Sequence, residues 1–235
     1  MPVNHAAPKL ESVLDELGHD IVSGVIATGD RFTLHDICER FGISRTVARE
    51  AMRALEQLNL VRSARRVGLT VLPREEWNVF DAAVIRWRLK EDAERDQQLH
   101  DLTQLRLGIE PIAARSMARL GSPEARQQLV ELGHRLRALG EAGQGDTQEF
   151  LDADVEYHRL ILVSCGNPMF AAMAPSITTV LVGRTELGLQ PKFPAQEAMD
   201  GHENLAAAIA EGDGDRAEKE SYILLKEVRS ALFNY

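Results

Sequence analysis

The sequence predicts a mainly α-helical protein in which an N-terminal winged helix-turn-helix precedes an all-helical bundle. Residues 33–41 and 44–60 carry helical patterns joined by a short glycine-containing turn, which is the helix-turn-helix layout. Two short strand patterns come next, at 60–63 and 68–72, and from residue 77 onward every segment has helical periodicity. We expect a winged domain at 1–72, a linker at 73–77 and a helical domain at 78–235.

The segment 44–60 is predicted to be a helix with two different faces. One face is an apolar stripe formed by Ala48, Ala51, Met52, Leu55 and Leu58. Arg45, Arg49 and Arg53 recur four residues apart and form a cationic stripe. Stacked guanidinium groups repel one another unless a polyanion faces them. The stripe therefore favours DNA as the partner, and the alternative is a small helical core with a solvated basic face.

Between the two predicted strands lies a basic tip that resembles a wing. Arg65 and Arg66 stand at this tip with Gly68 just after them, and arginines there suit a phosphate backbone or a minor groove. Charge placement supports this interpretation although the net charge is −9. Between Arg40 and Arg74, eight arginines oppose two glutamates, a local excess of six positive charges.

Composition excludes several other classes of protein. No apolar run approaches the length of a membrane span and no signal peptide begins the chain. We therefore expect a cytoplasmic protein without a membrane partner. The two cysteines, Cys38 and Cys165, form no metal or redox motif.

The helical domain is expected to consist of seven helices separated by glycine- and proline-containing breaks. Gly121-Ser122-Pro123 and Gly166-Asn167-Pro168 each stop one helix and open the next. The expected spans are 77–90, 96–120, 123–141, 146–165, 168–187, 195–211 and 213–233.

Three of these helices carry ionisable residues on stripes that should be apolar. Asp154 and His158 lie one turn apart on the apolar stripe of segment 146–165. His202 lies on the stripe of segment 195–211, and Arg106 lies at the edge of the stripe of segment 96–120. Two histidines and one carboxylate suit a divalent metal with open coordination positions. Arg106 can add a bidentate fork for an anionic ligand. The alternatives are a satisfied buried network or stripes whose phase is wrong.

Taken together, these segments resemble GntR-family transcription regulators with an all-helical FCD effector domain. The resemblance covers nearly the whole chain, and its motifs are S-R-T-V-A-R-E-A-M-R-A-L-E, Arg66-x-Gly68, L-R-L-G-I-E-P-I-A-A-R, D-V-E-Y-H-R-L-I and H-E-N-L-A-A-A-I-A-E-G-D. The resemblance implies a homodimer on a palindromic double-stranded operator, released from DNA by a ligand bound in the bundle. It matches Arg45 and Arg49 to DNA contacts and Gly68 to the wing tip. Our candidate DNA contacts are Arg45, Thr46, Arg49, Arg53, Arg65, Arg66, Gly68 and His35.

The chain departs from the family pattern at two positions. Asp154, His158 and His202 match three of the family's four usual metal ligands, but Leu224 stands where the fourth, a histidine, is usual. A divalent ion such as Zn, Ni or Mn would then need water or the effector to complete its coordination. In the first helix of the helix-turn-helix, His35 stands where the family has an arginine, so the base or phosphate contact expected of that arginine depends here on an imidazole.

The segment Pro73–Asn78, with Asn167 and Arg184, is similar to family members that respond to sugar acids. We therefore expect a regulator, most simply a repressor, controlled by a small organic acid such as an aldonate. The expected effector-binding residues are Arg106, Asp154, His158, His202, Asn167 and Arg184. A metal-responsive regulator without an organic effector and a constitutive DNA-binding module remain alternatives. A metal-dependent enzyme is a third, but no separate nucleophile or general base accompanies the three ligands, so we expect none.

Overall fold

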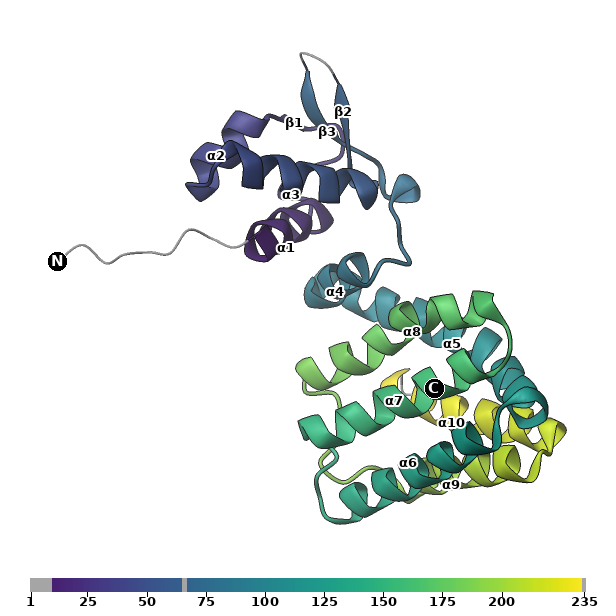
Figure 1. Ribbon diagram of the computed structural model, residues 1–235. Helices are drawn as coiled ribbons and strands as arrows, with labels where there is room; N and C mark the ends of the chain where they lie inside the picture. Colours follow the sequence, from purple (N-terminus) through teal and green to yellow (C-terminus); the bar gives the residue numbers. More distant parts are fainter. Residues whose placement is uncertain (1–9, 65–66, 234–235) are drawn as a thin grey trace. The chain divides into compact units, whose positions relative to one another are not determined.

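The computed structural model describes residues 10–64 and 67–233, and the chain divides into two compact units, residues 1–96 and 97–235 (Figure 1). The first unit contains α1 (Leu10–Val22), α2 (Leu34–Phe41), α3 (Arg45–Gln57) and α4 (Ala82–Lys90), with a 3-10 turn at Arg74–Glu76. Its sheet contains β1 (Arg31–Phe32), β2 (Val61–Ala64) and β3 (Gly68–Val71).

Local sequence signals fix the helix-turn-helix. Thr33 and Asp36 form a reciprocal capping box at the start of α2, and Gly42 ends that helix in the left-handed conformation, with φ of 62°. Ser44 caps α3 by accepting a hydrogen bond from the backbone N–H of Val47. The turn between the two helices is therefore as short as the sequence predicts.

The wing is a three-stranded antiparallel sheet in the order β1-β3-β2. Phe32 pairs with Leu69 and Val61 pairs with Val71. The sequence predicts β2 and β3 but not β1, because two residues are too few to show a strand pattern. The helical pattern of residues 9–27 predicts a longer first helix, but α1 ends at Val22, and Val25 is 74% exposed.

The boundary between the units differs from the expected one at residues 73–77. Trp77 and Trp87 are buried in the core of the first unit, and α4 packs against α1. The indole of Trp87 donates a hydrogen bond to Asp15. Gly18 makes the close approach possible, since a Cβ there would lie 2.4 Å from the Trp87 ring. Tertiary packing therefore places α4 with the winged domain, although its helical pattern resembles that of the bundle helices.

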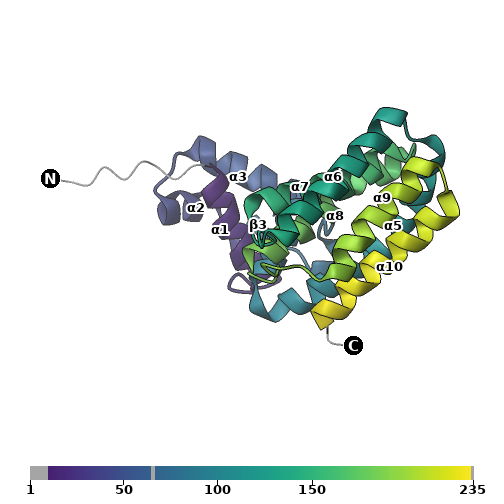
Figure 2. The same cartoon turned by 90° about the horizontal axis from the view of Figure 1, so that it is seen from below.

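The second unit is a helical bundle built from the long helix α5 (Asp92–Leu120) and five further helices. These are α6 (Pro123–Glu141), α7 (Gln148–Ser164), α8 (Pro168–Glu186), α9 (Gln196–Glu211) and α10 (Gly214–Phe233). Helix α7 packs between α6 and α8, while α9 packs between α6 and α10, as Figure 2 shows for α9 and α10. The expected breaks at 121–123 and 166–168 are confirmed.

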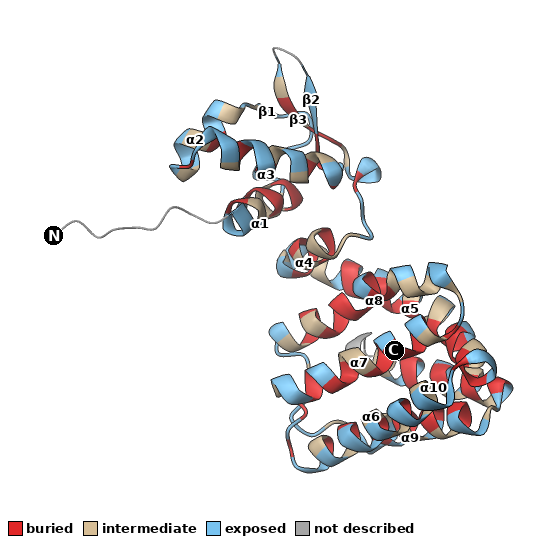
Figure 3. Ribbon diagram, in the orientation of Figure 1, coloured by how far each residue is buried: buried red, intermediate tan, exposed pale blue. Residues whose placement is uncertain are grey.

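Burial in this bundle is not restricted to apolar side chains. Figure 3 shows the buried faces turned toward the interior of the bundle. Tyr157, Leu129, Met117 and Ile161 are among the fully buried residues of its core. Several ionisable residues on α5, α7, α8 and α9 are also buried. These charged residues identify the candidate site.

Among the residues that the structure describes, no helix is both long enough and apolar enough to cross a membrane.

Candidate functional site

The exposed face of α3 presents two arginines that have no partner among the described residues. Arg45 and Arg49 are exposed, and neither forms a hydrogen bond or ion pair with any residue that the structure describes. Ser44 and Arg45 also place the free N–H groups of the first turn at this surface, which adds the positive end of the helix dipole. Thr46 is exposed beside them.

Other arginines of the basic segment are already neutralised. Arg40 pairs with Glu16 and Asp20, Arg53 with Glu50, Arg62 with Glu76 and Arg74 with Glu94. Among the arginines of this segment that the structure describes, only Arg45 and Arg49, on the first turns of α3, are left without an ion pair.

The other residues predicted to contact DNA lie in different environments or outside the described residues. His35 is exposed and lies 3.4 Å from Glu39. Gly68 has a φ of 90°, and a Cβ there would lie 2.6 Å from the carbonyl oxygen of Phe32. The close packing of β3 against Phe32 therefore requires a glycine at this position. Arg65 and Arg66 lie outside the described residues.

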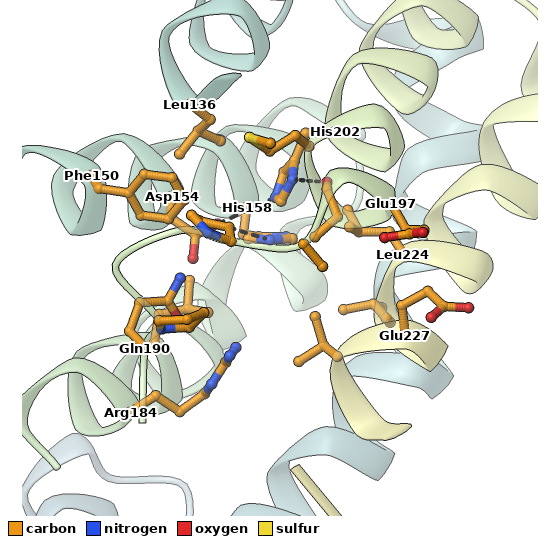
Figure 4. A pocket seen from close by; sticks show the side chains of 18 of the residues that line it. Leu136, Phe150, Asp154, His158, Arg184, Gln190, Glu197, His202, Leu224 and Glu227 are labelled. Atoms are coloured by element: carbon orange, nitrogen blue, oxygen red, sulfur yellow. Dashed lines mark hydrogen bonds and ion pairs between the residues drawn. The ribbon is translucent and has the colours of Figure 1, made fainter. Parts of the chain in front are cut away.

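The bundle contains a cavity of about 520 Å³, and the ionisable residues predicted on the stripes of α5, α7 and α9 all line it. Its lining includes Asp154 and His158 from α7, His202 from α9 and Arg184 from α8 (Figure 4). Arg106 from α5 also lines it. Apolar side chains complete the wall, among them Leu136, Phe150, Leu181, Leu224 and Leu225. This volume and this mixture of apolar wall and few polar groups are typical of small-molecule sites.

Three potential ligand atoms converge at the inner end of this cavity. The three residues Asp154, His158 and His202 each direct one such atom to within 4.8 Å of the others. Oδ1 of Asp154 lies 3.4 Å from Nε2 of His158 and 3.4 Å from Nε2 of His202. Oδ1 of Asp154 and Nε2 of His202 are buried without a hydrogen bond from a described residue.

The other imidazole nitrogens determine the tautomers. Nδ1 of His202 lies 2.7 Å from the carbonyl oxygen of Ala198, so it donates. Nδ1 of His158 lies 2.7 Å from Oε2 of Glu110 and donates to that carboxylate. In the neutral rings both Nε2 atoms then carry lone pairs directed at Asp154. Such a set fits a divalent cation, with Glu110 and the Ala198 carbonyl as the outer partners that metal-binding histidines need.

Electrostatics keep the carboxylates of this cluster ionised. Burial alone would raise the pKa of Glu110, but Arg106 and His158 outweigh it and lower that pKa to about 2. Burial likewise opposes ionisation of Asp154, and the two imidazoles hold its pKa well below the usual range. Burial lowers the pKa of His158, whereas Glu110 raises it, and the net direction is upward. The buried anions therefore favour a positive charge among them, carried by a proton or by a metal ion.

The two arginines of the cavity differ in their interactions. Arg106, expected to fork an anionic ligand, pairs along α5 with Glu110 instead. Arg184 forms no hydrogen bond or ion pair with a described residue, and its Nε is buried without a partner. Burial lowers the pKa of Arg184, yet a guanidinium remains charged at neutral pH. Arg184 is thus the cation available to an anionic ligand, and Arg106 positions Glu110.

Position 224 and Asn167 have different places in the bundle. Leu224 is 2% exposed and lines the cavity, packing against Gly201 next to His202. It contributes no ligand atom. Asn167 does not line the cavity; its side chain caps α8 by accepting a hydrogen bond from the N–H of Met169. The expected contact of Asn167 with an effector is therefore not supported.

Sequence reasoning missed Glu110, Gln190, Glu197 and Glu227. Glu110 had a detectable signal, because it lies four residues after Arg106 and interrupts an apolar run. The other three line the cavity from the loop after α8, from the first turn of α9 and from α10. Glu197 and Glu227 are exposed, and nothing in the local pattern distinguishes these three residues from surface residues outside the cavity.

Comparisons with known proteins agree with this architecture. The gntR family model of bacterial regulatory proteins matches residues 9–71, and the FCD domain model matches residues 101–226, more than half of the chain. The chain is 29% identical to the galactonate operon transcriptional repressor of Escherichia coli, over 92% of this chain and 93% of that protein.

Solved structures support the fold. E. coli McbR/YncC covers 96% of this chain and 97% of its own length, at a TM-score of 0.56 and 18% identity. Lar, which controls the Listeria monocytogenes agr system, covers 98% of this chain and 99% of its own, at 0.61 and 16%. The gntR family model describes bacterial regulatory proteins and the galactonate operon protein is a transcriptional repressor, which argues against the metal-dependent enzyme. The resemblance stated from the sequence is confirmed: the chain belongs to the GntR family of bacterial regulatory proteins, in the group that carries an FCD domain.

Proposed function

We propose that the chain is a repressor that binds a palindromic operator as a homodimer and is released from it by a small organic acid. Arg45 and Arg49 support the DNA-reading part. Because they have no partner among the described residues, they can pair with guanine edges or phosphates without first breaking an internal contact. A single recognition helix reads few base pairs, so pairing of two copies supplies the required specificity.

One observation carries the effector-binding part. The guanidinium of Arg184 is buried, charged and without a partner from the described residues, in a cavity that also holds the Asp154, His158 and His202 cluster. Burying an unpaired cation is unfavourable, so the arrangement favours a ligand with a carboxylate. The acid would bind Arg184 and reach the cluster either directly or through a divalent ion.

The class of acid is inferred from the similarity to the galactonate repressor. The name of that protein refers to a sugar-acid operon, and a cavity of about 520 Å³ accommodates a six-carbon acid. We infer that an aldonate is the effector. Binding would favour one arrangement of the bundle, and the shift cannot exceed the difference in effector affinity between the DNA-bound and free states.

The test combines thermal shift with a gel-shift titration on the operator. Full-length protein is screened against aldonates, uronates and simple hydroxy acids, each with and without chelator. A ligand at about a hundred times its Kd should raise the free energy of unfolding by roughly 2.7 kcal/mol. The same acid should release the operator.

Matched variants identify the site. Arg184→Gln should abolish the response to the acid while operator affinity is kept. Arg135→Gln removes an exposed arginine outside the cavity and should respond like the parent protein. If chelation alone abolishes the response and every acid is inert, the protein is a metal sensor. If neither metal nor acid alters DNA binding, the bundle serves another purpose.

A further inference from the structure

The cavity has two ends of opposite character. Arg184 and the three-residue cluster lie at one end, on α7, α8 and α9. On the other side, Glu197 in the first turn of α9 and Glu227 on α10 are solvent-exposed residues of the cavity lining (Figure 4). Apolar side chains also line the cavity, among them Phe150, Leu224 and Leu225.

The two glutamates carry charge that the cavity does not neutralise. Neither Glu197 nor Glu227 forms a hydrogen bond or ion pair with a residue that the structure describes. Among those residues, the only arginines or lysines in the cavity wall are Arg106 and Arg184, and Arg106 is already paired with Glu110. The side of the cavity at α9 and α10 is therefore negative, and its free acceptors favour hydrogen-bond donors.

A ligand that spans the cavity must satisfy both ends together. Its carboxylate would pair with Arg184, whose unpartnered Nε is buried in the same cavity. Its far end would meet Glu197 and Glu227, where hydroxyl or amino groups can donate but a second carboxylate would be repelled.

We propose that the effector is a monocarboxylic acid whose far end carries hydroxyl or amino donors, and that Glu197 and Glu227 exclude dicarboxylic acids of the same length. This inference rests on the proposed function, because it presupposes an organic acid in the cavity. It extends that function by assigning specificity to two residues outside the Arg184 and histidine end.

The experiment compares acids that share one carbon skeleton. Galactonate with galactarate, and gluconate with glucarate, differ only in whether the terminal carbon is a hydroxymethyl or a carboxylate. Isothermal titration of the full-length protein, with and without added Zn²⁺, should show at least about tenfold weaker binding of each diacid. The same titrations are run on Glu197→Gln/Glu227→Gln, which keeps size and hydrogen-bonding capacity.

The double variant should bind the diacids more tightly, so that the ratio of the diacid Kd to the monoacid Kd falls by about tenfold. Glu149→Gln/Glu186→Gln is the control: these two carboxylates are exposed like those of Glu197 and Glu227 but lie outside the cavity lining, and the double substitution changes the net charge equally. The control should keep the parent ratio.

Equal binding of monoacids and diacids by the parent protein would overturn the inference while leaving the proposed function intact. The inference would also be overturned if the ratio of diacid Kd to monoacid Kd were unchanged in the double variant, or if it fell equally in the control variant. If no acid of either class binds, with or without Zn²⁺, the proposed function fails and this inference fails with it.

Discussion

The carboxylate of Glu110 holds His158 by its Nδ1, at 2.7 Å, and so turns Nε2 of that ring toward Asp154. The same carboxylate pairs with Arg106 one turn earlier on α5. A single buried glutamate thus fixes the tautomer of one candidate ligand and neutralises the adjacent guanidinium. Glu110, His158 and Arg106 are each no more than 3% exposed, so the arrangement is part of the core.

Glu110→Gln should weaken divalent metal binding by about 10–100-fold, the usual effect of removing an outer partner of a metal-binding histidine. It should also lower the free energy of unfolding by about 3 kcal/mol, because Arg106 stays buried without its counter-charge. Metal titration and thermal denaturation measure the two effects separately. Asp152→Asn, an exposed change on α7, serves as the control. Unchanged metal affinity in the glutamine variant would show that Glu110 does not orient the ligand.

Leu224→His should strengthen metal binding by about tenfold or more, because it places an imidazole in the cavity wall that His202, His158 and Asp154 share. Leu224→Met keeps an apolar side chain of similar volume and should leave metal affinity at the parent value. Competition with a chromogenic chelator gives the affinities. If both variants bind metal equally, position 224 does not reach the ion.

Arg49→Ala should weaken specific operator binding by about 1–3 kcal/mol, since this guanidinium is exposed and without a partner among the described residues. Arg53→Ala on the same helix should cost less than about 1 kcal/mol, because Arg53 already pairs with Glu50. Gel-shift titrations at one fixed salt concentration compare the two variants. Equal losses of operator-binding free energy in the two variants would mean that the ion pair with Glu50 does not reduce the contribution of Arg53 to DNA binding.

Gly18→Ala should lower the free energy of unfolding by about 1–3 kcal/mol, because the added methyl group overlaps the Trp87 ring. Gly108→Ala is the matched comparison. It lies within α5 with no atom within 4 Å of the added carbon, so its better helix propensity should stabilise by about 0.5–1 kcal/mol. Denaturant unfolding gives both values. Opposite signs for the two substitutions are the expected result.

Local patterns were sufficient for most of the fold. The capping residues Thr33 and Ser44, the turn at Gly42 and the breaks at 121–123 and 166–168 act over a few residues, so helix order and most boundaries could be predicted. Arg45 and Arg49 were found for the same reason, since helical spacing alone places them on one exposed stripe. β1 has no such local signal, because its two residues form a strand only by pairing with β3.

The candidate site shows a different balance. Periodicity places Asp154, His158 and His202 on inward faces, and the cavity brings them together. Periodicity could not show which arginine is available to an anionic ligand, because that depends on which residue each arginine pairs with. Arg106 is paired by Glu110 on its own helix, whereas Arg184 on α8 is not.

Spacing along single segments was enough to predict the succession of helices, the basic face of α3 and the ionisable residues of the bundle. Folding in three dimensions assigned α4 to the winged unit, left Arg184 without a partner among the described residues and placed Glu197 and Glu227 in the cavity lining. Those outcomes depend on contacts between helices far apart in the chain, where packing and pairing of charges, rather than periodicity, select the neighbour.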